Sequence, residues 1–257
     1  MKRIVVKVGS AVLTQDGEIA LERMQALVDF LSELKKENEV ILVSSGAVAG
    51  GYTKLKLDRT IIANKQALAA IGQPILLKKY DKKFTKHDII VAQVLVTAGN
   101  FKRNEEILRV KKSINTLIEN DVIPIVNEND ATATDELELG DNDQLSAYIT
   151  RYTDSDMLII LSDIDAYYDN DPRSNENAKV LKMVHSINAE ELTKEVTPHN
   201  IFATGGIVTK LKAASYLLES DIDMFLASGF DLSDVKSFAL KNIHKGGTLF
   251  TKVIKWM

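Results

Sequence analysis

The 257-residue chain contains no cysteine, and its four histidines are scattered. The lack of thiols excludes disulfides, thiolate metal sites and a cysteine nucleophile. The wide spacing of the histidines argues against a classical zinc site. The sequence also has no excess of basic residues, since its net charge is −4 and its pI is near 5.7. This charge offers no basic footprint for nucleic acid, so any phosphate chemistry must depend on a few well-placed lysines.

Long hydrophobic runs are also missing. No stretch approaches the roughly 18 apolar residues that a membrane-spanning helix needs. The apolar run at residues 4–8 is too short for a signal peptide and no cleavage pattern follows it. We therefore expect a soluble, cytoplasmic protein. The apolar content of 45% and charged content of 26% are ordinary for a globular protein, and the length suits one large or two small domains.

Strand-like apolar runs alternate with helical patterns from end to end, which predicts an α/β fold with a mostly parallel central sheet and helices on both faces. Gly72 is expected to end one helix and Pro74 to open the next. A polar segment at residues 169–178 is the expected exposed loop. Strands are expected at residues 4–8, 40–43, 89–96, 122–126, 157–161, 222–226, 248–250 and 253–256, and helices at residues 21–36, 47–55, 61–71, 105–119, 142–152, 206–219 and 233–240.

An acidic segment at residues 127–143 follows the predicted strand at 122–126. Carboxylates and amides just past the end of a strand are what a small cationic or zwitterionic ligand needs, because ligands of parallel sheets collect at that edge. A solvated acidic loop is the alternative for a charge run considered alone. The segment holds seven acidic residues and no basic one: Glu128, Asp130, Asp135, Glu136, Glu138, Asp141 and Asp143.

Three glycine-bearing segments also stand out, and the first two lie at the ends of predicted strands. Residues 7–10 (Lys-Val-Gly-Ser) combine a lysine with a glycine whose following amides can bind an anion. Residues 43–47 (Val-Ser-Ser-Gly-Ala) lead into a helix, whose free N–H groups bind anions, although a simple Ser N-cap is the alternative. Residues 204–210 (Thr-Gly-Gly-Ile-Val-Thr-Lys) permit a tight turn against phosphates, or form an ordinary loop before a helix.

These segments together suggest phosphoryl transfer. That reaction needs cations around the migrating group, donors along the nucleotide phosphates and a positioned acceptor, with little covalent help from the protein. Lys7 and Lys210 could flank the transferred phosphate, and Asp143 could hold both lysines by charge-assisted hydrogen bonds. A turn at Ser162–Asp163, followed by aromatic residues, would suit a nucleoside. The common P-loop sequence is absent.

Taken together, these motifs resemble the amino acid kinase family over residues 2 to about 250. Asn-Glu-Asn-Asp (127–130) and Gly-Asp-Asn-Asp (140–143) are specific to the branch that phosphorylates the side-chain carboxylate of glutamate. Residues 64–73 and the turn at 171–173 fit as well. The resemblance implies an α/β/α sandwich in one domain, with an acceptor-binding part at about residues 1–152 and a nucleotide-binding part at about residues 153–257.

The resemblance also implies roles for individual residues. Lys7, Lys210 and Asp143 would be catalytic. ATP would be the co-substrate, and Mg²⁺ would sit on its phosphates rather than on protein ligands. Glutamate would be held by Ser45, Gly46, Ala47, Asn127, Asp130, Asp141 and Asn142, and the nucleotide by Lys7, Gly9, Ser162, Asp163, Thr204, Gly205, Gly206, Ile207, Val208, Thr209 and Lys210.

Two departures from the family pattern stand out. Many members of this branch carry a C-terminal PUA domain, which we do not expect here because the chain ends at Met257. Ala166 stands where a glycine is usual in the nucleotide loop, which is expected to change the loop more than the reaction. The resemblance implies a homo-oligomer and makes proline a candidate feedback inhibitor, although the sequence itself reveals neither property.

Three alternatives stay open from the sequence alone. Another kinase of the same fold would act on acetylglutamate, aspartate, carbamate or UMP. The acidic segment argues against acceptors without an ammonium group, and the lack of a basic cluster argues against a nucleotide acceptor. A non-catalytic amino-acid or nucleotide sensor would be expected to lack Lys7, Asp143 or Lys210, which are all present. A doubly wound dehydrogenase would need a Gly-x-Gly-x-x-Gly turn, and the chain has none.

Overall fold

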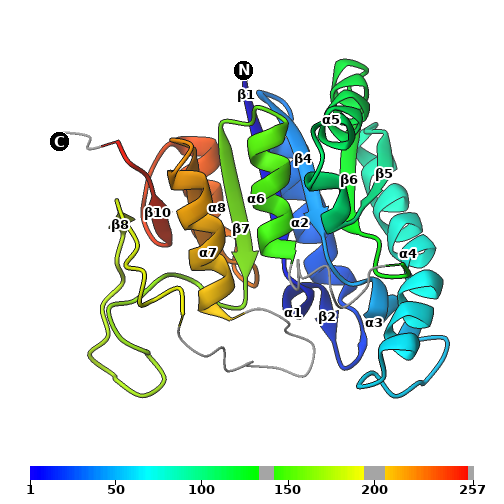
Figure 1. Cartoon of the computed structure of the whole chain (residues 1–257), viewed down its shortest axis with the longest axis horizontal. Helices are drawn as coiled ribbons and strands as arrows, with labels where there is room; N and C mark the ends of the chain where they lie inside the picture. Colours follow the sequence, from blue (N-terminus) through cyan, green and yellow to red (C-terminus); the bar gives the residue numbers. More distant parts are fainter. Residues whose placement is uncertain (133–141, 194–205, 254–257) are drawn as a thin grey trace.

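The structure, a computed structural model, describes residues 1–132, 142–193 and 206–253. Its centre is an eight-stranded sheet with the order β5-β6-β4-β1-β7-β9-β10-β8 (Figure 1). Only β10 runs antiparallel to a neighbour, β9, in this sheet. The strands are β1 (Lys2–Val8), β4 (Asn38–Ser44), β5 (Val91–Val96), β6 (Ile123–Glu128), β7 (Met157–Ser162), β8 (Met183–Val184), β9 (Asp223–Ser228) and β10 (Thr248–Phe250). The predicted α/β class and mostly parallel sheet are confirmed.

Helices cover both faces of this sheet, so the molecule has three layers (Figure 1). One apolar core lies between the sheet and α2, α4 and α8, and the other lies between the sheet and α5, α6 and α7. The helices are α1 (Ser10–Leu13), α2 (Leu21–Leu34), α3 (Ala47–Tyr52), α4 (Ile62–Phe84), α5 (Asn104–Glu119), α6 (Asn142–Tyr152), α7 (Ile207–Leu218) and α8 (Ser233–Lys241), with short 3-10 turns η1 (Thr85–His87) and η2 (Ala98–Phe101).

Side-chain alternation along β1 places its residues in the two different cores. Val6 and Val8 belong to the core under α2 and α4, whereas Val5 belongs to the core under α6 and α7. Because successive side chains of a strand point to opposite faces, Lys7 lies on the α6–α7 side together with Val5. The chain therefore directs a lysine into an apolar layer, where burial requires a partner for its charge.

The predicted break at Gly72 and Pro74 is wrong, because α4 runs without interruption through both residues. A Cβ atom on Gly72 would lie 1.7 Å from the Ala47 carbonyl oxygen and 2.4 Å from Gly51 N. The glycine therefore permits close contact between α4 and α3, and it does not end the helix. The buried face of α4 continues past Pro74, so tertiary packing outweighs the local cost of the proline.

A few other details differ from the prediction. The small hairpin of β2 (Thr14–Gln15) and β3 (Glu18–Ile19) and the two-residue strand β8 were not predicted, because elements this short carry little periodicity. The last predicted strand, at residues 253–256, lies almost wholly outside the described residues. Within the described part of the chain, none of the helices has the length and apolar character needed to cross a membrane.

Candidate active site

The site lies where four parallel strands end at the same edge of the sheet. In register, Val8 of β1 pairs with Ser44 of β4 on one side and with Leu161 of β7 on the other. Val126 of β6 pairs with Val43 of β4. This register brings residues 9, 45, 127–130 and 162 to one edge, as expected for ligand sites of open parallel sheets.

A single carboxylate holds two lysines at this edge. Lys7 Nζ donates to Asp143 Oδ1 at 2.5 Å, and Lys210 Nζ donates to Asp143 Oδ2 at 3.1 Å. The side chains are 4%, 0% and 3% exposed for Lys7, Asp143 and Lys210, respectively. The three groups come from β1, α6 and α7, and their formal charges sum to +1. The structure brings these three predicted residues together, and the two ammonium groups leave the cluster with a net positive charge.

The local fold supports the position of Asp143. It is the second residue of α6, where the helix dipole favours a negative charge. The Thr209 hydroxyl lies 2.8 Å from Asp143 Oδ2 and 3.0 Å from the Gly206 carbonyl oxygen. Ser146 Oγ donates to the Asp143 main-chain oxygen at 2.6 Å. The carboxylate is therefore fixed from several sides before any ligand arrives.

One glycine lies next to this lysine clamp, which we define as Lys7, Asp143 and Lys210. A Cβ atom on Gly9 would lie 3.8 Å from Lys7 Nζ, at van der Waals distance, so Gly9 is a direct neighbour of the ammonium group. Gly46 has φ +109°, a left-handed conformation that favours glycine, and it is the N-cap residue of α3. The alternative interpretation of a serine N-cap at this turn is therefore wrong.

A polar network surrounds Asn142 between the ends of β4 and β6. Its Nδ2 donates to Ser45 Oγ at 2.8 Å and to Asn127 Oδ1 at 3.0 Å. Asn142 directly precedes Asp143, so the same helix end contributes to the clamp and to this network. Asn142 Oδ1 is buried and has no hydrogen-bond partner among the described residues. The structure thus brings together three residues that were predicted to bind the phosphoryl acceptor: Ser45, Asn127 and Asn142.

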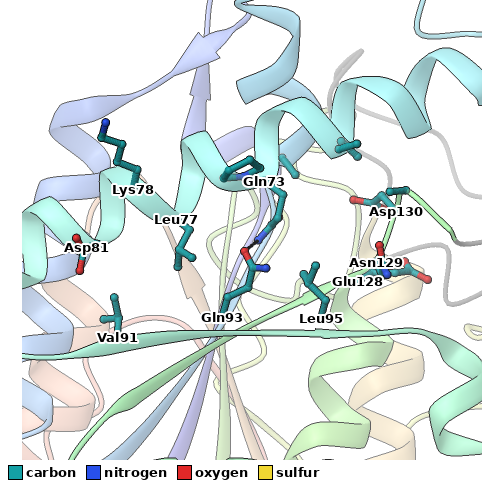
Figure 2. A pocket seen from close by; sticks show the side chains of 15 residues that line it. Gln73, Leu77, Lys78, Asp81, Val91, Gln93, Leu95, Glu128, Asn129 and Asp130 are labelled. Atoms are coloured by element: carbon teal, nitrogen blue, oxygen red, sulfur yellow. Dashed lines mark hydrogen bonds between the residues drawn. The ribbon is translucent and has the colours of Figure 1, made fainter.

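Asp130 follows the end of β6 and lines a cavity of about 520 Å³ between α4 and strands β5 and β6 (Figure 2). Burial raises the pKa of Asp130 to about 6, and the nearby Lys65 charge partly opposes this shift. Ala47 lines the same cavity. A carboxylate with a raised pKa in a cavity is a candidate partner for a cationic ligand, which would restore its charge.

The predicted nucleotide residues begin at the end of β7. Ser162 Oγ donates to Asp163 Oδ1 at 2.9 Å, and Gly206 is the N-cap residue of α7. Val208 is buried, and Ile207 packs against the core beneath α7, so both can offer only main-chain groups to a ligand. Three of the predicted site residues lie outside the described part of the chain: Asp141, Thr204 and Gly205.

Two contributions to the site were not predicted from the sequence. The Thr209 hydroxyl lies against Asp143, a contact that was not predicted, and its expected role in nucleotide binding stays a prediction. Gln73 received no role, yet it is only 8% exposed and accepts a hydrogen bond from Asn127 Nδ2 at 2.9 Å. The signal that could have found it was a glutamine on the otherwise apolar face of α4, since buried polar groups need partners.

The described residues include no group of three or more histidine, cysteine, aspartate or glutamate side chains that could hold a metal ion. Near the clamp, both Asp143 oxygens already accept hydrogen bonds from lysines.

Comparisons with known proteins identify the family to which this chain belongs. The chain matches the amino acid kinase family over residues 2–228. It is 49% identical to glutamate 5-kinase of Leishmania donovani over 97% of this chain and 95% of that protein. It is also 49% identical to glutamate 5-kinase of Wolinella succinogenes over 98% of each chain. The crystal structure of UMP kinase from Ureaplasma parvum superposes with a TM-score of 0.65 at 16% identity, over 98% of this chain and 99% of that one. This last likeness concerns the fold alone.

Proposed function

Since this chain belongs to the amino acid kinase family, we propose that it transfers the γ-phosphoryl group of ATP to the γ-carboxylate of L-glutamate, giving L-glutamyl 5-phosphate and ADP. Its relatives at 49% identity are glutamate 5-kinases, and they align over nearly the whole chain. The observation that carries the proposal is the lysine clamp beside the Asn142 network. It combines a centre for a transferred phosphate with a polar site for a small acceptor. The reaction is the first step of proline biosynthesis.

The nucleotide would lie over the carboxyl ends of β7 and β9. Ser162 and Asp163 would contact the nucleoside, and the turn that contains Gly206 would bind the phosphates with main-chain N–H groups. Lys210 would reach the phosphates from α7. Lys7, with Gly9 as its direct neighbour, would approach from β1. The other residues proposed for the nucleotide are Thr204, Gly205, Ile207, Val208 and Thr209.

The acceptor would lie next to the clamp, between β4 and β6. Its ammonium group would pair with Asp130 and Asn142 Oδ1, of which the latter is a buried acceptor. Its α-carboxylate would be received by main-chain groups of residues 45–47. Asn127 and Asp141 complete the proposed set. An ammonium group near Asp130 would favour the ionised carboxylate and oppose the effect of burial on its pKa.

The chemistry would be a direct in-line displacement. A glutamate γ-carboxylate oxygen forms a bond to the γ-phosphorus while the bond from that phosphorus to the β,γ-bridging oxygen breaks, and the electron pair leaves with ADP. A free glutamate side chain has a pKa of about 4.3, so the nucleophile is already ionised at neutral pH and no general base is required. Lys7 and Lys210 would stabilise the charge on the migrating group and on the leaving oxygen. Asp143 would hold both lysines in place.

Mg²⁺ would be bound chiefly to the nucleotide phosphates, because the clamp carboxylate already accepts hydrogen bonds from two lysines. When bound, it would neutralise phosphate charge and favour an extended polyphosphate. We also propose one catalytic domain, with residues 1–152 forming the acceptor part and residues 153–257 the nucleotide part. A cytoplasmic location, a homo-oligomeric state and feedback inhibition by proline complete the proposal and rest on the family alone.

The test is ADP release with Mg·ATP and one of four acceptors: glutamate, acetylglutamate, aspartate or UMP. Hydroxylamine is added, because it traps an acyl phosphate as a hydroxamate. We expect glutamate-dependent ADP release together with a hydroxamate. Turnover of another acceptor instead would refute the role proposed for the Asn142 network, while ATP binding without any turnover would favour a non-catalytic sensor.

A further inference from the structure

Four carboxamides form a hydrogen-bonded chain from the acceptor site to the cavity beside α4. Asn142 Nδ2 donates to Asn127 Oδ1 at 3.0 Å, and Asn127 Nδ2 donates to Gln73 Oε1 at 2.9 Å. Gln73 Nε2 then donates to Gln93 Oε1 at 3.2 Å, the contact seen at the centre of Figure 2. The residues come from α6, β6, α4 and β5, so only the tertiary fold joins them. The first three amides each donate to the next one, in the direction that leads away from the lysine clamp.

Two contacts orient the Asn127 amide, one to its oxygen from a main-chain group and one from its nitrogen to Gln73. The backbone N–H of Glu128 donates to Asn127 Oδ1 at 2.9 Å. An N–H group can only donate, so the oxygen of Asn127 must lie on that side and its nitrogen must face Gln73. Gln73 therefore presents its oxygen to Asn127, and its own nitrogen faces Gln93. The orientation of each amide follows from that of its neighbour.

The same logic determines what Asn142 offers to a ligand. Its nitrogen donates to Asn127 Oδ1 and to Ser45 Oγ, with a longer contact of 3.5 Å to the Ser44 carbonyl oxygen, so both hydrogens are used. Its oxygen is buried, and it has no hydrogen-bond partner within the part of the chain that the structure describes. A buried acceptor without a partner is costly, so this atom is suited to a ligand that brings a donor. Under the function proposed above, that donor is the ammonium group of the amino-acid acceptor.

We propose that Gln73 is a positioning residue for recognition of the acceptor ammonium group. It accepts from Asn127 Nδ2 and, together with the Glu128 N–H group, keeps Asn127 Oδ1 toward Asn142, so that Asn142 Oδ1 faces the ligand. Gln73 acts through Asn127 and not on the acceptor itself. Gln93 has a lesser role, because its carboxamide is exposed and can reorient when its partner changes. This inference rests on the proposed function, since it assigns a specificity device to the same site.

The test compares Gln73→Leu with Gln73→Glu. Gln73→Leu removes one of the two contacts that orient the Asn127 amide and leaves Asn127 Nδ2 without its acceptor. We expect the KM for glutamate to rise about tenfold, the loss expected for one hydrogen bond to a charged group. The kcat and the KM for ATP should stay within about twofold. Gln73→Glu retains an acceptor oxygen, and exposed Gln93 can turn its nitrogen toward it. We therefore expect this variant to keep the KM for glutamate within about threefold of wild type.

Glutarate distinguishes positioning from loosened packing, because it carries both carboxylates of glutamate without the ammonium group. Its inhibition constant against glutamate should be unchanged in Gln73→Leu. The ratio of this constant to the KM for glutamate should therefore fall about tenfold, again the loss of one hydrogen bond to a charged group. Gln25→Leu is the matched control, since Gln25 is a hydrogen-bonded glutamine outside the carboxamide chain, on α2. It should leave both constants unchanged.

Three results would overturn the inference: an unchanged KM in Gln73→Leu, an equal rise of both constants, or a Gln73→Glu variant as impaired as Gln73→Leu. If Gln73→Leu does not fold, Gln73→Met fills a similar volume and is judged by the same criteria. Glutamate turnover by the wild-type protein is measured first. Its absence would show that the proposed function has failed, which is a different outcome from failure of the Gln73 variants to discriminate.

Discussion

Replacing Asp143 by asparagine should separate the stability of the lysine clamp from its activity. The carboxylate lies 2.5 Å from Lys7 Nζ and 3.1 Å from Lys210 Nζ. At an effective dielectric constant near 20, those distances correspond to gross attractions of about 7 and about 5 kcal/mol. Desolvation of the buried charges offsets much of this attraction. Removing one member of a buried ion pair typically costs about 3–5 kcal/mol, because the remaining charge stays buried.

We therefore expect Asp143→Asn to lower the free energy of unfolding by about 3–5 kcal/mol, and to lower kcat by about 100-fold or more, because the two ammonium groups would no longer be held in place. Urea unfolding followed by circular dichroism measures the first quantity, and ADP release measures the second. Mg·ATP should restore part of the lost stability, since its phosphates would supply negative charge to the same lysines.

The double variant Asp143→Asn/Lys210→Met provides the decisive comparison. In Asp143→Asn, Lys7 and Lys210 both lose their contact with the carboxylate. The second substitution removes one of these two buried charges. We expect the double variant to be more stable than Asp143→Asn alone by about 1–3 kcal/mol while remaining inactive, as coupled neighbours are not additive. If the two substitutions destabilise the protein additively, or if Asp143→Asn keeps wild-type stability and turnover, then Asp143 does not organise the clamp.

Three further predictions concern other parts of the site. Lys7→Arg and Lys210→Arg should each reduce kcat at least about tenfold in the ADP-release assay, because a planar guanidinium cannot replace a compact ammonium group in a buried position. A variant with a near wild-type rate would show that the substituted lysine is not needed for catalysis. Burial raises the pKa of Asp130 to about 6. A protonated Asp130 cannot pair with an ammonium group, so kcat/KM for glutamate should rise as the pH increases through about 6. Asp130→Asn should lose this pH dependence. An identical pH profile in the variant would contradict the role of Asp130 in binding glutamate. Gly72→Ala should lower the melting temperature by several degrees or prevent folding, since the new Cβ would lie 1.7 Å from the Ala47 carbonyl oxygen. If calorimetry gives the melting temperature of wild type, then α3 and α4 can separate without cost.

The order of the elements could be predicted from the sequence because the apolar patterns are local. Residues 142–152 were predicted as a helix with the boundaries that α6 has, and the strands at the sheet centre were found to within a few residues. The exceptions have a common cause. Gly72 and Pro74 are ordinary signals for a helix end, but α4 continues because Gly72 contacts α3 and the buried face extends on both sides. No local pattern contains that contact.

Much of the site was also accessible from the sequence, since glycines, lysines and acidic residues follow the predicted strands. Parallel strands place their carboxyl ends together, so Lys7 and the acidic segment that contains Asp143 could be grouped from their positions along the chain. Lys210 was added because it lies in a glycine-bearing segment. The contacts of single side chains were harder to predict. Thr209 contacts the clamp carboxylate rather than serving only as part of a nucleotide turn.

The sequence by itself determined the class of fold and the chemical inventory of this protein, because strand and helix periods and residue types are properties of the chain. Only the tertiary structure decided which groups meet. One carboxylate on α6 holds lysines from β1 and α7, and four amides from four different elements form one directed chain. Such contacts join residues up to 136 positions apart. They depend on strand register and helix packing, which no local pattern of residues specifies.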